Sequence, residues 1–225
     1  IGSNNGLSIN TLSNRIIISD GAGNIRQYID NVGNVGIGTD DPSANLEIDG
    51  GNLSKFRISG NGNDGADNEF GSIEFYNKDT SGVSPNVASS IKALSQSSVG
   101  SGGLLTFSTS IGNEAEGTDA TERMRISGDG NVGIGTDNPI RILHIKSSTT
   151  AAIQLENTSE ADSFIDFMNP SRVFRVGYDD SSDVFKVAVT NFNSNALVVD
   201  STGNVGIGTA SIGTQGNLYI VGSGV

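Results

Sequence analysis

The stretch Gly33-Asn34-Val35-Gly36-Ile37-Gly38-Thr39 (GNVGIGT) recurs letter for letter at 130–136 and 203–209 of this 225-residue chain. Three identical copies in so short a chain indicate a repeat protein. Valine and isoleucine alternate with glycine inside the motif, which is the period of a β-strand. The motif therefore predicts a strand with one aliphatic face and one face that bears no side chains.

The two faces predict different kinds of packing. Bare glycine lets another backbone approach closely, and it costs roughly 0.5–1 kcal/mol per residue relative to alanine. A lone strand would not tolerate this cost, so we expect a second copy of the chain to pack against it. The close-packing glycines are then Gly36, Gly38, Gly133, Gly135, Gly206 and Gly208. The expected assembly core, shared between chains, is Val35, Ile37, Val132, Ile134, Val205 and Ile207.

The sequence on either side of the motif repeats as well. Each copy follows a strand and a turn rich in Asn, Asp and Gly, which tolerate the backbone of a tight turn. Pro42 and Pro139 stop the motif strand, since proline lacks the amide that a ladder needs. A short strand then resumes at 46–48, 143–145 and 218–220.

Two copies depart from this pattern. The third has Ala210-Ser211-Ile212 where the proline turn should be. A degenerate fourth copy at 16–25 has the strand and the turn but no glycine face.

Composition narrows the function classes. The chain has no cysteine, so it has no disulfide framework and no thiolate chemistry. Its net charge is −12 without a run of Lys or Arg, which argues against binding to nucleic acid or to an anionic membrane. No apolar stretch approaches the roughly 20 residues of a membrane helix. The chain starts at Ile1 without a signal peptide, so we expect it to come from a longer or processed product.

Short alternating runs between Gly-, Asn- and Ser-rich loops predict an all-β fold. We expect four segments: an N-terminal β-rich shaft (1–45), a first β-module (46–142), a second (143–217) and the start of a following segment (218–225). The segment 87–95 fits a helix or a strand, and its serines favour the strand. Strands are further predicted at 56–58, 72–76, 104–109, 123–126, 152–156, 164–167, 174–178, 184–189 and 196–199.

The strings GNVGIGTDDP, ERMRISGDGNVGIGTDNP with LHI following, and ALVVDSTGNVGIGT resemble the fibre regions of bacteriophage tail-fibre and tailspike proteins. GSIEFYN and GLLTFSTS resemble the modules between such repeats, and the likeness spans most of residues 24–222. In that family the repeats often precede an endosialidase-type intramolecular chaperone, which would follow Val225. The resemblance implies an elongated homotrimer with interwound β-prism or β-helix-like connectors, located on a virion. It also implies other tail proteins as partners and binding to a host-surface glycan or protein receptor.

Elementary physics independently favours self-association, although it does not fix the number of chains. Strands this thin make no core alone, and open edges invite pairing with neighbouring chains. Winding identical chains about an axis buries the aliphatic face and closes the edges.

Residues with catalytic or metal-binding chemistry are sparse. The lone histidine, His144, occupies a slot held elsewhere by Glu47 and Tyr219, which is typical of a solvated strand face. Two acidic loops, 61–69 and 179–183, are rich enough in oxygen for calcium but lack the spacing of a calcium loop, so solvated turns are the default. We expect no metal and no cofactor.

Three other functions stay open beside the structural fibre. A glycan-binding module would use the segments between the repeats. A polysaccharide depolymerase would need two carboxylates across a sugar groove, and the chain has no tryptophan for sugar stacking. A bacterial surface adhesin could carry similar repeats. The glycine motif lacks the lysine of a phosphate loop, so we expect no enzyme activity.

Overall fold

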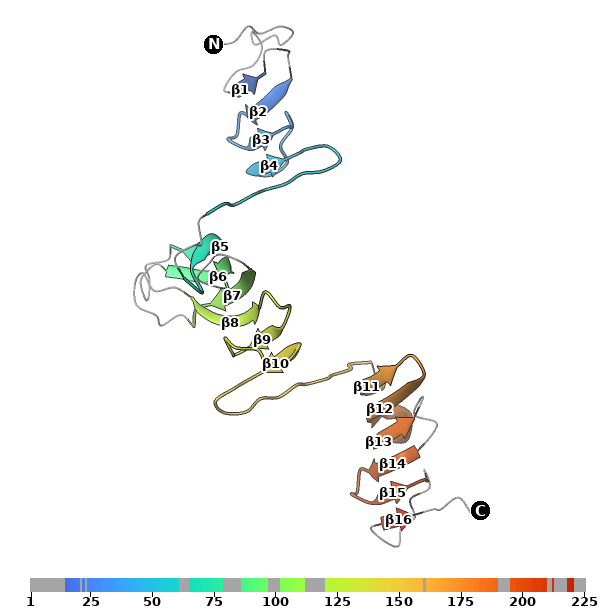
Figure 1. Cartoon of the computed structure of the whole chain (residues 1–225). Coiled ribbons are helices and arrows are strands. Elements are labelled where there is room, and N and C mark those ends of the chain that lie inside the picture. Colours follow the sequence, from blue (N-terminus) through green and yellow to red (C-terminus); the bar gives the residue numbers. More distant parts are fainter. Residues whose placement is uncertain are drawn as a thin grey trace. The chain divides into compact units, whose positions relative to one another are not determined.

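The computed structural model describes residues 15–20, 22, 24–60, 65–78, 86–96, 102–111, 120–159, 161–189, 195–209, 212 and 218–220. The chain divides into two units, 1–149 and 150–225, which we describe separately (Figure 1). Within the described residues the regular elements are strands, apart from one short 3-10 turn, η2 (Asp180–Ser182). The predicted all-β class is therefore confirmed.

The first unit contains two sheets of mixed direction. The first sheet has the order β1 (Ile16–Ser19), β2 (Ile25–Ile29), β3 (Val35–Ile37), β4 (Leu46–Ile48). The second has the order β10 (Leu143–Ile145), β9 (Val132–Ile134), β8 (Thr121–Ile126), β7 (Gly103–Thr109), β6 (Asn86–Ser95), β5 (Glu69–Asn77). Neighbouring strands are antiparallel except where the motif strand pairs with the strand that follows it in the sequence. These parallel pairs are β3–β4 and β9–β10.

The second unit forms one sheet. Its order is β11 (Ser163–Asn169), β12 (Arg172–Asp179), β13 (Val184–Val189), β14 (Asn195–Asp200), β15 (Val205–Ile207), β16 (Leu218–Ile220). It too is antiparallel until the final pair, β15–β16, which is parallel. All three sheets thus end in the motif strand and a parallel partner.

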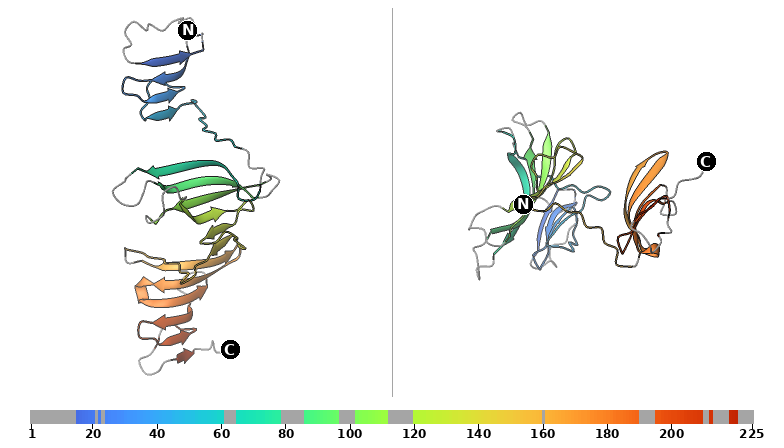
Figure 2. Two further views of the ribbon diagram at one scale, coloured as in Figure 1. Left: turned by 90° about the vertical axis from the view of Figure 1, so that its left-hand side faces the viewer. Right: turned by 90° about the horizontal axis from the view of Figure 1, so that it is seen from below.

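Each sheet is a single layer. Strand pairs with substantial contact in the described residues are all hydrogen-bonded neighbours, and Figures 1 and 2 show the strands following one another in chain order. Each sheet by itself therefore has one layer of described strands and no sandwich core of its own.

Most predicted strands are confirmed, including 87–95, which forms β6. The strands predicted at 56–58 and 152–156 are wrong as assigned. Both segments are extended but form no ladder with the described residues. Alternation sets the backbone of a strand, whereas a ladder also needs a partner.

The expected segment boundaries at 45/46, 142/143 and 217/218 stay a prediction. The structure adds that β4 and β10 are hydrogen-bonded to the motif strands before them, and that β16 is bonded to β15. We call the unit formed by the turn, the motif strand, the following loop and the parallel strand a connector. In the part of the chain that is described, no helix has the length and apolar character to span a membrane.

Candidate assembly surface

Each connector begins with a tight turn closed by a polar side chain. Asp30 accepts hydrogen bonds from the backbone of Val32 and Asn34, and from the Asn34 amide, at 2.9–3.0 Å. Asp200 does the same for Thr202 and Asn204. These bonds favour the carboxylate, so the pKa of Asp30 is lowered despite the opposing effect of desolvation, and that of Asp200 falls to about 2, chiefly through the Asn204 side chain.

The other two copies vary this turn. Ser127 replaces the aspartate in the second connector, and its hydroxyl accepts from the Asn131 backbone at 3.2 Å. In the degenerate copy, Asp20 bonds to Asn24 through both backbone and side chain. The turn predicted for that copy is present.

The glycine face is filled by the chain's own loop. A Cβ built on Gly36 would lie 2.4 Å from the carbonyl oxygen of Thr39, and one on Gly133 would lie 2.5 Å from that of Thr136. On Gly206 it would lie 2.9 Å from the Thr209 oxygen. The close approach therefore occurs within the chain. The expectation that another copy covers these glycines is corrected, because the loop folds back onto them.

A hydrogen bond from an asparagine and packing of an apolar side chain fix this loop against the glycine face. Asn131 donates from its side-chain amide to the Pro139 carbonyl at 3.1 Å, as Asn34 does to Pro42 at 3.5 Å. In the third copy the Ile212 side chain packs on the glycine face, 3.1 Å from a Cβ on Gly206. An aliphatic side chain thus contacts the face where the proline contacts it in the second copy.

The second glycine of the motif has a role in addition to the predicted close packing. The motif strand ends at Ile37, Ile134 or Ile207, and the next residue has a φ of +81°, +69° or +71°. Residues that carry a Cβ atom rarely adopt this left-handed backbone conformation, so glycine is needed where the chain turns. Gly38, Gly135 and Gly208 therefore turn the chain. A Cβ on Gly38 would also lie 2.1 Å from the Asp49 carbonyl oxygen, and one on Gly135 would lie 2.3 Å from that of Lys146.

The predicted assembly residues lie on the opposite, aliphatic face of each sheet, where they extend rows that cross every strand. In the second sheet, register pairs give one row of Ile73, Ile91, Phe107, Met124, Ile134 and Ile145. A parallel row runs through Gly71, Ala93, Leu105, Ile126, Val132 and Leu143.

The other sheets repeat this arrangement. The rows of the third sheet are Ile165, Val176, Val187, Leu197, Ile207 and Ile220, and Ser163, Tyr178, Phe185, Val199, Val205 and Leu218. Those of the first sheet are Ile18, Gln27, Ile37 and Ile48, and Ile16, Ile29, Val35 and Leu46. We call these three surfaces the aliphatic faces.

The aliphatic faces are open to solvent. The motif isoleucines Ile37, Ile134 and Ile207 are 42%, 41% and 39% exposed. The first residue of each parallel strand (Leu46, Leu143, Leu218) is 53–58% exposed. Equivalent positions thus have nearly equal exposure in all three sheets. The structure brings each Val/Ile pair together with its sheet neighbours, and no described part of the chain buries it fully.

The opposite faces bury polar side chains instead. In the second sheet Ser90, Thr106, Ser108 and Arg125 are all less than 9% exposed. The Arg125 guanidinium makes a bidentate pair with Glu122 at 2.6 and 2.7 Å, and it donates to the Asp137 carbonyl at 3.0 Å. These contacts, led by the hydrogen bonds to Glu122, raise the pKa of Arg125. Arg125 thereby ties β8 to the connector loop.

A buried ion pair holds the same face of the third sheet. Lys186 and Asp179 are each 4% exposed, and the Lys186 ammonium donates to the Asp179 carboxylate. Burial raises the pKa of Asp179, but the bonds from Lys186 and Ser181 outweigh it and leave the pKa lowered. The expectation of a solvated acidic turn at 179–183 is therefore corrected at Asp179. Of the other acidic loop, 61–64 lie outside the described residues.

His144 is half-buried rather than solvated. It pairs in register with Gly133, and its Nδ1 is buried without a hydrogen-bond partner in the described residues. Tyr219 and Glu47 are half-buried at the same position. The slot lies on the glycine side of the sheet, beside the folded-back loop, which accounts for the burial.

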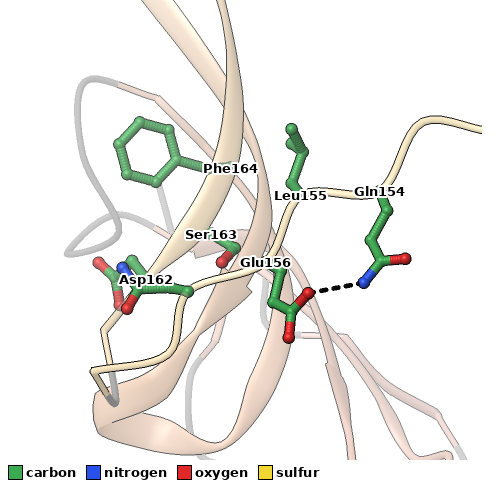
Figure 3. A pocket seen from close by; sticks show the side chains of 7 residues that line it. Gln154, Leu155, Glu156, Asp162, Ser163 and Phe164 are labelled. Atoms are coloured by element: carbon green, nitrogen blue, oxygen red, sulfur yellow. Dashed lines mark hydrogen bonds between the residues drawn. The ribbon is translucent and has the colours of Figure 1, made fainter. Parts of the chain in front are cut away.

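A groove of about 410 Å³ lies at the start of the third sheet. It is lined by residues 154–157 and by Asp162, Ser163 and Phe164, most of which Figure 3 labels. Gln154 donates to Glu156 there at 2.9 Å. The described residues contain no cluster of three or more His, Asp or Glu placed to hold a metal ion.

The local geometry defines a class of protein: single-layer β-sheets, each with one unfilled aliphatic face, joined by self-contained connectors. Neither a family model nor a curated protein matches this sequence.

Proposed function

We propose that this chain is a structural component of a bacteriophage tail fibre, in which three copies form an elongated shaft that contributes to host attachment. The observation that carries the proposal is the set of three aliphatic faces. Neighbouring strands lie about 4.8 Å apart, so a six-stranded face is about 24 Å across. Large contiguous apolar surfaces mark sites of association.

The burial pattern supports self-association over a role as an isolated domain. In the second and third sheets, polar side chains such as Thr106, Arg125 and Lys186 are buried. Members of the aliphatic rows are exposed instead, among them Ile73 at 48% and Phe185 at 44%. This distribution is inverted relative to an ordinary soluble domain. Placing aliphatic faces of identical chains around a common axis would bury them, and cyclic symmetry supplies the same environment to each chain.

The proposed number of chains, three, and the proposed location on a virion come from the resemblance of the repeats to phage fibre regions. In this proposal the connectors of three chains are interwound as a β-prism or β-helix, and the protein is located on the virion, outside the host cell. Its partners are other tail proteins and a host-surface glycan or receptor. The role is mechanical and adhesive rather than catalytic, and it needs no cofactor, nucleic acid or membrane insertion.

The test is the mass of the native particle by light scattering. A trimer gives three times the chain mass of 23.2 kDa. A compact folded species at the mass of one chain would contradict the proposal. Binding of the trimer to host cells, compared with binding of a connector variant that stays monomeric, tests the attachment role.

A further inference from the structure

Two segments of the chain have the sequence and backbone of strands but no ladder. Figure 1 draws residues 53–59 (LSKFRIS) and 151–156 (AAIQLE) as extended chain, and apolar and polar residues alternate along 55–59 and 153–156. No backbone hydrogen bond joins either to the described residues. Phe56 is 68% and Ile153 is 63% exposed. Each segment leads into the first strand of a sheet, and we call them linker strands.

Each linker strand meets the sheet that follows it at its C-terminal end. The Ile58 side chain lies 2.8 Å from the place of a Cβ on Gly71, and a Cβ on Gly60 would lie 2.2 Å from the Phe70 carbonyl oxygen. Residues 154–157 likewise share the groove of Figure 3 with the start of β11. Residues 53–57, which precede Ile58, form no ladder with this sheet in the described residues.

Within the described part of the chain, the strands that follow the linkers form a ladder on one edge only. β5 is hydrogen-bonded only to β6, and β11 only to β12, within the described residues. An open edge presents unpaired N–H and C=O groups that accept another strand. Adding a strand to such an edge is a common mode of protein association.

Charge and alternation match the first linker strand to the edge of β5. Lys55 and Arg57 alternate with Phe56 and Ile58, and both cations are exposed without an ion pair in the described residues. On β5, Glu74 lies on the face opposite Ile73 and is also exposed without such a pair. A strand laid along β5 with Phe56 on the aliphatic face would place its cations beside Glu74 in a chain of net charge −12.

We propose that linker strand 53–57 hydrogen-bonds to the open edge of β5 in a second copy of this chain. Phe56 then extends the aliphatic face of the neighbour, and Lys55 or Arg57 pairs with Glu74. Linker strand 152–155 and the edge of β11 form the equivalent contact in the second unit. The inference rests on the proposed self-association and names the strands that exchange.

A second copy is favoured because the chain does not use its own edge. With Ile58 already at Gly71, continuing as a hairpin would bring Phe56 toward Ile73, yet no such ladder forms. In a cyclic assembly every copy donates its linker strands to one neighbour and receives those of another, so the edges of β5 and β11 are paired in every copy.

Engineered cysteines test the contact directly, because the chain has none of its own. Chains with Lys55→Cys and chains with Arg57→Cys are each mixed with chains that carry Glu74→Cys, refolded and oxidised. We expect one of the two mixtures to give a disulfide-linked species of twice the chain mass that no variant forms alone. The matched control is Phe56→Cys with Glu74→Cys: these positions lie on opposite faces, and a disulfide needs Cβ atoms about 4 Å apart. It should give at least tenfold less product.

Two results would overturn the inference. One is an assembled particle in which neither mixture cross-links above the control. The other is a double variant, Lys55→Cys/Glu74→Cys or Arg57→Cys/Glu74→Cys, that cross-links only within single chains. Light scattering on the same samples separates the two proposals. An oligomer without the cross-link contradicts the strand exchange alone, whereas a monomer contradicts the fibre proposal and the exchange with it.

Discussion

The carbonyl oxygen of Thr136 lies 2.5 Å from the point that a Cβ on Gly133 would occupy. The contact is with backbone, so it cannot be relieved by rotating a side chain. Gly133→Ala must push the loop at 136–139 off the sheet. We expect a loss of about 1–3 kcal/mol in the free energy of unfolding, measured by denaturant unfolding.

Gly103 in β7 is the matched control for this substitution. A Cβ there would meet nothing closer than the Phe70 ring at 3.8 Å. Gly103→Ala should be neutral or stabilise by up to about 1 kcal/mol, because alanine reduces the entropy of the unfolded chain. Equal losses in both variants would contradict the packing of the loop on the glycine face.

Ile134 tests the aliphatic face. Ile134→Asp should weaken assembly, since burying an isoleucine contributes about 2 kcal/mol per chain and the aspartate adds an unpaired charge. Particle mass against concentration measures the effect. Ile111→Asp, at a 71% exposed position outside the rows, should leave the mass unchanged. A fully assembled Ile134→Asp variant with an unchanged melting temperature would show that this face is not the interface.

Arg125 and Arg123 lie on the same strand but differ in burial. Arg125→Ala leaves Glu122 and the Asp137 carbonyl without their donor inside the fold, so we expect a cost of about 3 kcal/mol. Arg123→Ala removes bonds only to Thr109 at an exposed position and should cost less than about 1 kcal/mol. Urea unfolding of both variants tests this difference, and a similar cost for the two would refute it.

The turn at Asp200 predicts that the stability of the fold decreases at acidic pH. Its pKa is lowered to about 2 in the folded chain, so the carboxylate stabilises the fold at pH values above its ordinary pKa of about 4. That contribution is lost as the pH falls from about 4 through 2. Asp200→Ser copies Ser127 of the second connector, which does not titrate. Thermal unfolding at pH 5 and pH 2 should show a smaller drop in melting temperature for this variant than for the parent chain.

The sequence predicted the strands well because alternation is local. The motif, its turns and the strand at 87–95 could all be found from the period of two. The sequence could not say which face the chain itself would cover. Asp179 was expected in a solvated turn, yet it meets Lys186 across that turn and both are buried.

The roles within the motif were only partly predictable. Gly36 and Gly38 look alike as alternating residues, but the first accommodates a loop and the second has a left-handed backbone. One sign was present in the sequence: Thr39, Asp40 and Pro42 follow Gly38 as turn residues would. The strands predicted at 56–58 and 152–156 form no ladder with the described residues. A ladder depends on a partner strand, which the local sequence pattern does not specify.

The first and second connectors each form the same internal backbone hydrogen bonds. Val35 bonds to Asn45 and Asp49 to Ile37, and the same two bonds recur as Val132 to Ile142 and Lys146 to Ile134. Beyond these, the connector needs from the preceding module only an antiparallel strand beside it. A gene encoding such a chain could therefore recombine at the stretches that encode GNVGIGT. Whole modules of unequal length would then be exchanged without disturbing the junction between module and connector. The 97- and 73-residue spacings between copies are what such shuffling would leave behind.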